Sequence, residues 1–355
     1  MAALSLVGCA SSPPTTVLDD STPIELPPAP DGSPVAIHGR LQVAGTSLVD
    51  QSGQRVQLKG VSSMWLAGES GPYAESESAL KYMRDNWKLS VIRAAMGGSG
   101  TDTPVSSPQS PLLPRVEQIV QNAIRLGVYV IVDWHTEQAV SQQADAITFF
   151  TAMAHKYGAY PNLIWEPYNE PGKGVTWAQI KPYHEALVDA IRPIDPNNLI
   201  VMGTPNWSQY VDTAAANPVA PASGTANLLY TVHFYACDHT QWLRDRADTA
   251  IAAGVAIFIT EFGATPANGG QGSTNYVCRD EANLWFDWMA ANNVSGAAWK
   301  LDKCSDTSCI LANGASASGP WPDDVLTTDA NNTLVSTGKT QGGGHGTLVV
   351  DWIRE

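Results

Sequence analysis

The sequence predicts a (β/α)8 barrel, in which eight parallel strands alternate with helices. Eight short apolar runs rich in β-branched residues recur along the chain at intervals of about 28 to 40 residues. Helix-like stretches separate most of these runs, and strands that alternate with helices are typical of a parallel sheet. Even spacing over eight units, without a glycine-rich phosphate-binding turn, favours a closed barrel over an open doubly wound sheet.

The predicted strands are Val56–Val61, Ser90–Ala95, Tyr129–Asp133, Leu163–Trp165, Leu199–Met202, Leu228–His233, Val255–Thr260 and Gly296–Trp299. The predicted helices between them are Glu75–Trp87, Leu113–Leu126, Ala144–Lys156, Gln179–Ile191, Asp238–Ala253 and Glu281–Asn292. Pro182 falls at the start of one helix and Pro193 after its end, both positions that suit proline. Residues 312–346, rich in Gly, Ser, Asn and Asp, are expected to form a long surface loop before a last helix at Leu348–Arg354.

The chain is expected to comprise three parts, residues 1–9, 10–36 and 37–355. Leu6-Val7-Gly8-Cys9 resembles the lipobox of bacterial lipoproteins, in which the cysteine is acylated, although no basic region precedes it. If that cysteine is not incidental, Cys9 is a lipid anchor. Ala10–Pro34 contains seven prolines and should be an extended, unpacked tether. We therefore expect an exported protein, either secreted or held at the cell surface or outer membrane.

Charge and length narrow the classes of partner. The net charge of −14 and the pI near 4.8 disfavour binding to nucleic acid or to an anionic membrane surface, which needs clustered Lys and Arg. A neutral polymer needs no complementary charge. No apolar run reaches the roughly 20 residues of a transmembrane helix. The 319 residues of the third part fit one barrel with long loops, and we expect a monomer.

Four cysteines remain if Cys9 carries lipid. An even number in an exported chain predicts two disulfides, for which three pairings are possible. The order of the strands favours Cys237 with Cys278, which would join the loops after the sixth and seventh strands, and Cys304 with Cys309, which would close the loop after the eighth. Zinc is the competing interpretation, but no CxxC or HExxH pattern supports it. We expect no metal and no cofactor.

Two predicted strands end in a glutamate. The fourth runs into Asn169-Glu170-Pro171 and the seventh into Glu261-Phe262-Gly263. The glutamates are 91 residues apart, close to three βα units of roughly 31 residues each. Two carboxylates at the C-terminal ends of different strands are what a retaining glycosidase needs, one as the acid and one as the nucleophile.

Other polar side chains fall at the same ends of the strands. Because side chains alternate along a strand, Glu166, Tyr168 and Glu170 are expected to share one face, with Glu166 deeper as a hydrogen-bonded interior carboxylate. Asp133 should point inward, two residues below His135. The remaining candidates are Arg93, His135, His233, Tyr235 and Trp299. Any one of them could be a packing residue, but together they predict an active site at the C-terminal face of the barrel.

With these residues, the chain resembles the bacterial endoglucanases of glycoside hydrolase family 5 over about residues 37–355. The ordered set of motifs that carries the resemblance is Ile92-Arg93, Asp133-Trp134-His135, Asn169-Glu170-Pro171, His233-Phe234-Tyr235, Glu261-Phe262-Gly263 and Trp299. Gly203–Gln209 and the opening Leu41–Ser63, with a short hairpin through Asp50–Gln54, also resemble the cellulase subfamily. The substrate implied is a β-1,4-linked glucan.

The resemblance implies a role for each motif. Glu170 would act as acid and base and Glu261 as nucleophile, and the surroundings must give these identical side chains different pKa values. Arg93 and Tyr235 are suited to favour the charged form of Glu261. Asn169 would bond the sugar 2-hydroxyl, and His135 and His233 would position the acid and the sugar. Trp299 and Trp207 would be sugar platforms, because sugar rings pack on flat aromatics.

Two segments depart from the family pattern. Many relatives carry a His after the first strand, where this chain has Ser62-Ser63-Met64-Trp65, and Trp65 is a candidate for sugar stacking. After the eighth strand the family often has Trp, a few residues and then Asp-Lys. Here Trp299-Lys300-Leu301-Asp302-Lys303 is shorter, which puts the expected contact of Lys303 with a distal sugar in doubt.

Alternative functions share these residues. A β-mannanase or another β-glucanase of the same clan would use both glutamates and differ in its loops. A non-catalytic surface protein that binds glycans would usually have lost one of the carboxylates or Asn169, and all three are present. A metal-dependent barrel hydrolase would need a His/Asp cluster on several strands. His155 and His184 fall on helices and His38 and His345 near the ends, so that set is missing.

Overall fold

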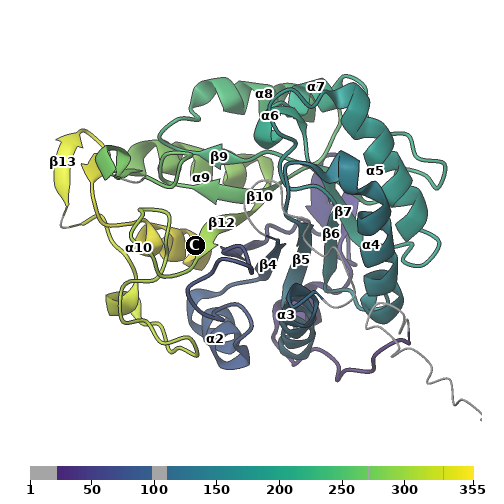
Figure 1. Cartoon of the computed structure of the whole chain (residues 1–355), viewed down its shortest axis with the longest axis horizontal. Helices are drawn as coiled ribbons and strands as arrows, with labels where there is room; N and C mark the ends of the chain where they lie inside the picture. The colour runs from purple at the N-terminus through teal and green to yellow at the C-terminus, as the bar shows by residue number, and fades with distance from the viewer. Residues whose placement is uncertain (1–21, 98–109, 271, 331) are drawn as a thin grey trace, which may run out of the picture.

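The computed structural model describes residues 22–97, 110–270, 272–330 and 332–355. At its centre, each strand of a parallel sheet pairs with the next, and the last pairs with the first to close a barrel (Figure 1). The barrel strands are β3 (Lys59–Ser63), β4 (Val91–Met96), β5 (Tyr129–Trp134), β6 (Leu163–Glu166), β7 (Leu199–Met202), β8 (Leu228–Thr231), β10 (Ile257–Gly263) and β12 (Ser295–Leu301). The (β/α)8 fold and all eight predicted strands are confirmed.

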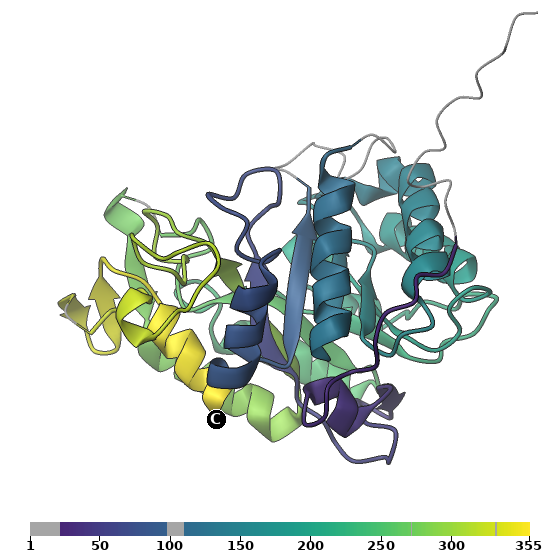
Figure 2. The same ribbon diagram turned by 90° about the horizontal axis from the view of Figure 1, so that it is seen from below.

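Helices surround the barrel, and each predicted helix is present within a few residues of its expected bounds (Figures 1 and 2). The longer ones are α2 (Glu77–Tyr82) with the π-helical η1 (Met83–Trp87), α3 (Leu112–Leu126), α4 (Gln143–Tyr157), α5 (Trp177–Ile191), α8 (Gln241–Ala252), α9 (Arg279–Asn292) and α10 (Gly346–Arg354). The short ones are α1 (Pro34–His38), α6 (Pro205–Ser208), α7 (Val211–Ala215), η2 (Ala139–Gln142), η3 (Gly272–Thr274) and η4 (Asp323–Val325). No helix in the described ranges is both long and apolar enough to cross a membrane.

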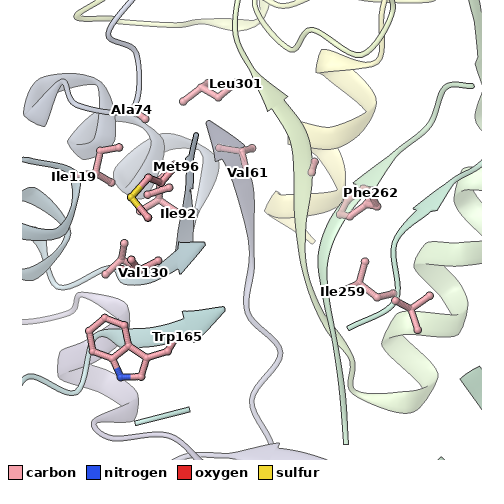
Figure 3. Close-up of a cluster of buried hydrophobic side chains, with 14 of the residues drawn as sticks. Val61, Ala74, Ile92, Met96, Ile119, Val130, Trp165, Ile259, Phe262 and Leu301 are labelled. Carbon is pink, nitrogen blue, oxygen red and sulfur yellow. The ribbon is translucent and has the colours of Figure 1, made fainter. Parts of the chain in front are cut away.

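Alternation along the strands divides the core into two clusters. Outward side chains such as Val61, Ile92, Val130 and Trp165, from four successive strands, pack against the helices (Figure 3). Inward side chains near the start of the strands, including Tyr129 and Phe258, form a separate apolar cluster inside the barrel. Toward the C-terminal ends of the strands, the side chains that point into the barrel become polar. The buried charged groups Arg93, Asp133, Glu166 and Glu261 therefore lie at the end of the barrel where the site is built.

The N-terminal segment differs from the expected tether. The hydroxyl of Tyr160 donates to the carbonyl of Ile24 at 2.8 Å and accepts from the amide of Leu26 at 2.6 Å. Val35, in α1, is buried in the interior cluster at the base of the barrel. The unpacked tether is therefore wrong for residues 22–36, because these apolar side chains give the segment surface to bury. Cys9 and the rest of the N-terminal prediction lie outside the described residues.

A two-stranded hairpin precedes the barrel. It pairs β1 (Gln42–Ala44) with β2 (Ser47–Val49), and Val49 then bridges to Arg55 around the predicted turn at 50–54. The Asp50 carboxylate holds that turn, because it accepts hydrogen bonds from the amides of Ser52 and Gln54. The predicted turn at 50–54 is thus present, and the turn between β1 and β2 is an additional one that was not expected.

Residues 312–346 are more ordered than the surface loop that we predicted. They contain β13 (Thr333–Ser336) and β14 (Lys339–Gln341), which join β11 (Tyr276–Cys278) in a three-stranded antiparallel sheet. Trp321 is fully buried, and its ring packs near Trp87 at a centroid distance of 5.9 Å. The polar composition of the segment did not predict this structure, because only a few large apolar side chains, such as Trp321, hold it in place.

Candidate active site

The two predicted glutamates meet at the C-terminal end of the barrel. Glu170 follows β6, and Glu261 lies on β10. One oxygen of each carboxylate and one nitrogen of His233 lie within 4.8 Å of one another. Retaining glycosidases hold their two carboxyl groups about 5 to 5.5 Å apart, whereas inverting enzymes need about 6.5 to 9.5 Å to admit a water molecule. This close approach fits a retaining pair better than an inverting one.

Glu261 is held in its charged form. The Nη1 group of Arg93 donates to one carboxylate oxygen at 2.9 Å, and the Tyr235 hydroxyl donates to the other at 2.6 Å. Burial acts to raise the pKa of Glu261, but the positive charges of His233 and Arg93 and the Tyr235 hydroxyl outweigh it and lower that pKa. An ionised carboxylate with both oxygens oriented is suited to act as a nucleophile.

The surroundings shift the pKa of Glu170 in the opposite direction. Burial raises the pKa of Glu170, the negative charge of Glu261 adds to that rise, and the hydrogen bond with His233 only partly opposes it. Its Oε1 lies 2.9 Å from Nδ1 of His233, and the side chain lines the cavity. A carboxyl group that keeps its proton near a carboxylate that has lost its own is the arrangement expected of an acid and a nucleophile.

Arg93 is the central cation of the site. It is fully buried, and its guanidinium donates to Glu166 at 2.8 Å, to Glu261 at 2.9 Å and to Asn169 at 2.6 Å, with Asp133 also 2.9 Å away. Glu166 is therefore the interior, hydrogen-bonded carboxylate that the sequence predicted. One arginine contacts three buried carboxylates. The ion pairs and hydrogen bonds of this network are what allow charged groups inside the barrel, because they offset the loss of hydration.

His135 links the carboxylates to the aromatic wall of the site. Its Nδ1 lies 2.6 Å from Asp133, and its Nε2 accepts a hydrogen bond from the indole of Trp65 at 2.7 Å. The ring of His135 also stacks on Trp299 at a centroid distance of 5.4 Å and an angle of 12°. Because an indole only donates, the proton of a neutral His135 lies on Nδ1, toward Asp133. Trp65 and Trp299 thus lie side by side, with ring centroids 6.0 Å apart.

A cavity of about 660 Å³ opens over the carboxylates. Its lining residues are Met64, Trp65, His135, Glu137, Glu170, Trp207, Gln209, His233, Tyr235, His239, Glu261, Ala267, Asn268, Gly269, Trp299, Lys300 and Asp306. Trp65 and Trp207, from two loops, and Trp299, from β12, contribute flat apolar surfaces, and the rest of the lining is largely polar. Such a cavity is suited to a sugar polymer, whose rings have apolar faces and polar edges.

The loop that carries Trp207 has an unusual backbone. Asn206, Trp207 and Ser208 all have positive φ, at 59°, 54° and 55°. Three consecutive non-glycine residues in the left-handed region are costly, so surrounding contacts must hold them. The amide of Trp207 donates to the carbonyl of Pro171, and the Ser208 hydroxyl donates to that of Asn169, both at 2.8 Å. The turn therefore ties the Trp207 loop directly to the loop of the acid.

A β-bulge in β10 brings an extra side chain into the site. The pairing of β10 with β12 shifts between Ile259 and Phe262, so that two residues of β10 lie where regular pairing would place one. Both Thr260 and Glu261 point inward as a result, since Thr260 bonds Glu166 and Glu261 bonds Arg93. Gly263 follows, where a Cβ atom would lie only 2.8 Å from the ring of Tyr235.

One sequence prediction about the site is wrong. Tyr168 does not share a face with Glu166 and Glu170, because β6 ends at Glu166 and the ring of Tyr168 packs on Tyr183 of α5 at 5.5 Å. Lys303 is not among the residues that line the cavity, and its contact with a distal sugar stays a prediction. At that end the cavity wall is formed by Lys300, whose amine lies 3.0 Å from the carboxylate of Asp306.

Sequence reasoning missed several cavity residues. They are Met64, Glu137, Gln209, His239, Ala267, Asn268, Gly269, Lys300 and Asp306. Most lie in loops after the strands, where no alternation predicts direction. Lys300 and Asp306 offered one signal in the sequence. Lys300 directly follows the predicted site residue Trp299, and Asp306 lies in the loop between Cys304 and Cys309, which was predicted to lie at the same face of the barrel.

Disulfides constrain the loops around the cavity. They join Cys237 with Cys278 and Cys304 with Cys309, which is the pairing that the order of the strands favoured. The second disulfide encloses Asp306, and the amide of Thr307 donates to the carbonyl of Gly269 in the loop after β10 at 3.1 Å. Cys304, Asp306 and Cys309 are also close enough to hold a metal ion, but their sulfurs are already joined to each other.

The chain is similar to known cellulases and endoglucanases. Residues 49–305 match the family model described as cellulase, glycosyl hydrolase family 5. An endoglucanase from Clostridium saccharobutylicum is 43% identical over 82% of this chain and 63% of its own length. Endoglucanase N from Pectobacterium atrosepticum is 41% identical over 93% of this chain and 72% of its own length. The chain thus spans about two thirds of these relatives.

Solved structures agree. A structure from Cytophaga hutchinsonii superimposes with a TM-score of 0.79 at 36% identity, covering 91% of this chain and 96% of that one. The catalytic domain of an endoglucanase from Thermobifida fusca superimposes with a TM-score of 0.77 at 28% identity, covering 91% of this chain and all of that one. A variant of the Thermobifida domain, with a TM-score of 0.76 at the same identity and coverage, was solved in complex with cellotetraose.

Proposed function

The chain belongs to glycosyl hydrolase family 5, and from that membership and the geometry of its two glutamates we propose that it is a retaining endo-β-1,4-glucanase. Its substrate would be a cellulose-type glucan, cut at internal bonds. The observation that carries the proposal is the close pair of Glu170 and Glu261, whose surroundings shift their pKa values in opposite directions.

The proposed reaction has two steps. Glu170 gives its proton to the glycosidic oxygen that leaves, while the Glu261 carboxylate attacks the anomeric carbon and forms a glycosyl-enzyme. Water then attacks that intermediate, and Glu170, now a carboxylate, takes the proton of the water. Once Glu261 is esterified its negative charge is gone, so the pKa of Glu170 falls and suits it to act as a base.

The other site residues would support these steps. Arg93 and Tyr235 orient the nucleophile, and His233 contacts the acid. Trp299 would stack on the sugar whose bond is cleaved, with Trp65 beside it and Trp207 on the side of the leaving group. Cellotetraose bound to the Thermobifida variant supports a cello-oligosaccharide as the ligand of this cavity. The buried Asn169 would reach the sugar from beneath.

Release of reducing sugar from carboxymethylcellulose tests the proposal. We expect activity in the wild type and its loss, by about 10² to 10⁴-fold, in Glu170→Gln, because that is the usual contribution of a general acid and base. Glu77→Gln, on an exposed helix, is the matched control and should keep full activity. Activity on mannan but not on carboxymethylcellulose would replace the substrate, and full activity of Glu170→Gln would refute the site.

The dependence of kcat/KM on pH should be bell-shaped. Activity falls at low pH as Glu261, whose pKa is lowered, gains a proton and can no longer attack. It falls at high pH as Glu170, whose pKa is raised, loses the proton that it must donate. A soluble cello-oligosaccharide, whose leaving sugar needs a proton from the acid, gives the profile over the range in which the protein stays folded. A profile without a basic limb would contradict the assignment of Glu170 as the acid.

We further propose that the protein is exported, since structural disulfides are typical of oxidising compartments. Anchoring through Cys9 would place it in the membrane fraction of cells, and Cys9→Ser would move it to the soluble fraction. A wild-type protein found only in the soluble fraction would contradict the anchor.

A further inference from the structure

We propose that Thr260 and Glu166, beneath the acid, hold a proton on Nε2 of His233, so that the only nitrogen of His233 that titrates is Nδ1, which faces Glu170. Thr260 and Glu166 are then positioning residues that act on the acid through His233. The inference rests on the proposed function in one respect, which is that Glu170 is the acid.

Four side chains, those of His233, Thr260, Glu166 and Arg93, link the acid to the nucleophile in an unbroken path. Glu170 Oε1 lies 2.9 Å from His233 Nδ1, and His233 Nε2 lies 2.9 Å from the Thr260 hydroxyl. That hydroxyl lies 2.6 Å from Glu166 Oε1. The other oxygen of Glu166 accepts from Arg93 at 2.8 Å, and Arg93 donates to Glu261. The bulge of β10 completes this path, because it lets the successive residues Thr260 and Glu261 both point inward.

The position of each proton follows from what each group can donate. Glu166 is ionised, because its contact with Arg93 outweighs burial and lowers its pKa to about 2. It therefore only accepts, and the single hydroxyl proton of Thr260 must go to it. Thr231 accepts from the amide of Thr260 at 3.1 Å, and its hydroxyl lies 2.8 Å from that of Thr260. The Thr260 oxygen has two lone pairs left, one for Thr231 and one for His233.

His233 must consequently donate from Nε2. If Nε2 carried no proton, its lone pair would face the Thr260 oxygen, whose only proton is already donated to Glu166. His233 can then change its charge only at Nδ1, 2.9 Å from the acid. Burial acts to lower the pKa of His233, but the nearby carboxylates of Glu166, 3.8 Å from Nε2, and Glu170 raise it to about 9, which is consistent with a doubly protonated ring at neutral pH.

Several ionisable groups surround His233 and share in this balance. They are Glu166 and Glu170 from β6 and its loop, Glu261 from β10, Arg93 from β4, His135 after β5, Tyr235 of β9 (Phe234–Tyr235) and His239 after it. The carboxylates favour the positively charged form of His233, whereas Arg93 and burial disfavour it. An imidazolium at this point stabilises the ionised form of Glu170 and so keeps its pKa from rising further.

Thr260→Val tests the inference, with Thr260→Ser as the matched control. Valine keeps the shape of threonine but cannot accept from Nε2, so a neutral His233 with its proton on Nδ1 becomes the favoured form. Loss of the acid proton then leaves the Glu170 carboxylate beside an uncharged ring, and the pKa of the acid rises. We expect the basic limb of kcat/KM to move up by about one to three pH units. Thr260→Ser should keep the wild-type limb.

Nitrogen-15 NMR of the His233 ring gives a second readout that does not depend on activity. In the wild type we expect Nε2 to carry a proton at every pH at which the protein is folded, and only Nδ1 to titrate. An unprotonated Nε2 in the wild type would overturn the inference, whether or not Thr260→Val folds. So would a Thr260→Val variant with an unchanged basic limb. Failure of the proposed function is distinct, since it would appear as an active Glu170→Gln variant.

Discussion

Glu261→Gln is expected to lower kcat/KM on a soluble cello-oligosaccharide by about 10³-fold or more, the largest loss of any single substitution in the cavity. The amide is close in shape to the carboxylate and keeps an oxygen that can accept from Tyr235, but it cannot form the glycosyl-enzyme. Because substrate contacts remain, KM should change much less than kcat. Initial rates with each purified variant give both constants.

The contrast with Glu170→Gln separates the two roles. A substrate with an activated leaving group, such as a dinitrophenyl cellobioside, needs no acid in the first step, so Glu170→Gln should form the glycosyl-enzyme readily and Glu261→Gln should not. Azide should then revive turnover in Glu170→Gln, because it attacks the intermediate without a base. Equal loss on activated and natural substrates in both variants would contradict the division of roles.

Arg93→Met is expected to destabilise the protein by about 3 to 5 kcal/mol, the usual cost of removing one partner from a buried ionic network. Without the guanidinium, Asp133, Glu166 and Glu261 would lie together in the barrel with no cation of comparable reach. One or more of them would take up a proton, the pKa of Glu261 would rise, and the acid limb of activity would move to higher pH.

Urea unfolding measures the first effect and a pH profile the second. Arg354→Met is the control, because Arg354 pairs with Asp323 at the surface and should contribute less than about 1 kcal/mol. Arg93→Lys should restore only part of the stability, since a lysine cannot bond Glu166, Asn169 and Glu261 together. An Arg93→Met variant as stable as the wild type would show that the interior carboxylates are neutral in the native protein.

The barrel was predictable because period and spacing are global signals. Apolar runs at even intervals predict the strands, and a glutamate at the end of two of them predicts the site, since parallel strands present their carboxyl ends on one face. Alternation also predicted the depth of Glu166 and Asp133 correctly. These inferences concern residues inside regular strands, where backbone geometry fixes direction.

Predictions failed where the backbone leaves that geometry. Tyr168 lies beyond the last paired residue of β6, so its direction is set by packing on α5 and not by alternation. Thr260 was not a candidate, because a regular strand cannot point two successive residues inward, and only the bulge in β10 does so. The left-handed turn at Trp207 is likewise invisible in a sequence without glycine at these positions.

The lysine at the cavity wall shows a further limit of prediction from sequence. The family pattern implied a distal contact for Lys303, which the shorter spacing here put in doubt, and Lys300 is the lysine at the cavity wall, where it pairs with Asp306. Tertiary contacts of the loop after β12, including the disulfide between Cys304 and Cys309, decide which of the two faces the cavity. Local sequence offers no rule for such a loop.

Trapping of the covalent intermediate tests the central claim most directly. The protein would be incubated with a 2-deoxy-2-fluoro cellobioside that has an activated leaving group, digested, and examined by mass spectrometry. The account predicts one added fluoro-cellobiosyl group, on the peptide that contains Glu261. A label on a different residue, or turnover of the substrate that releases the inverted sugar without any labelled protein, would contradict retaining chemistry at this pair of glutamates.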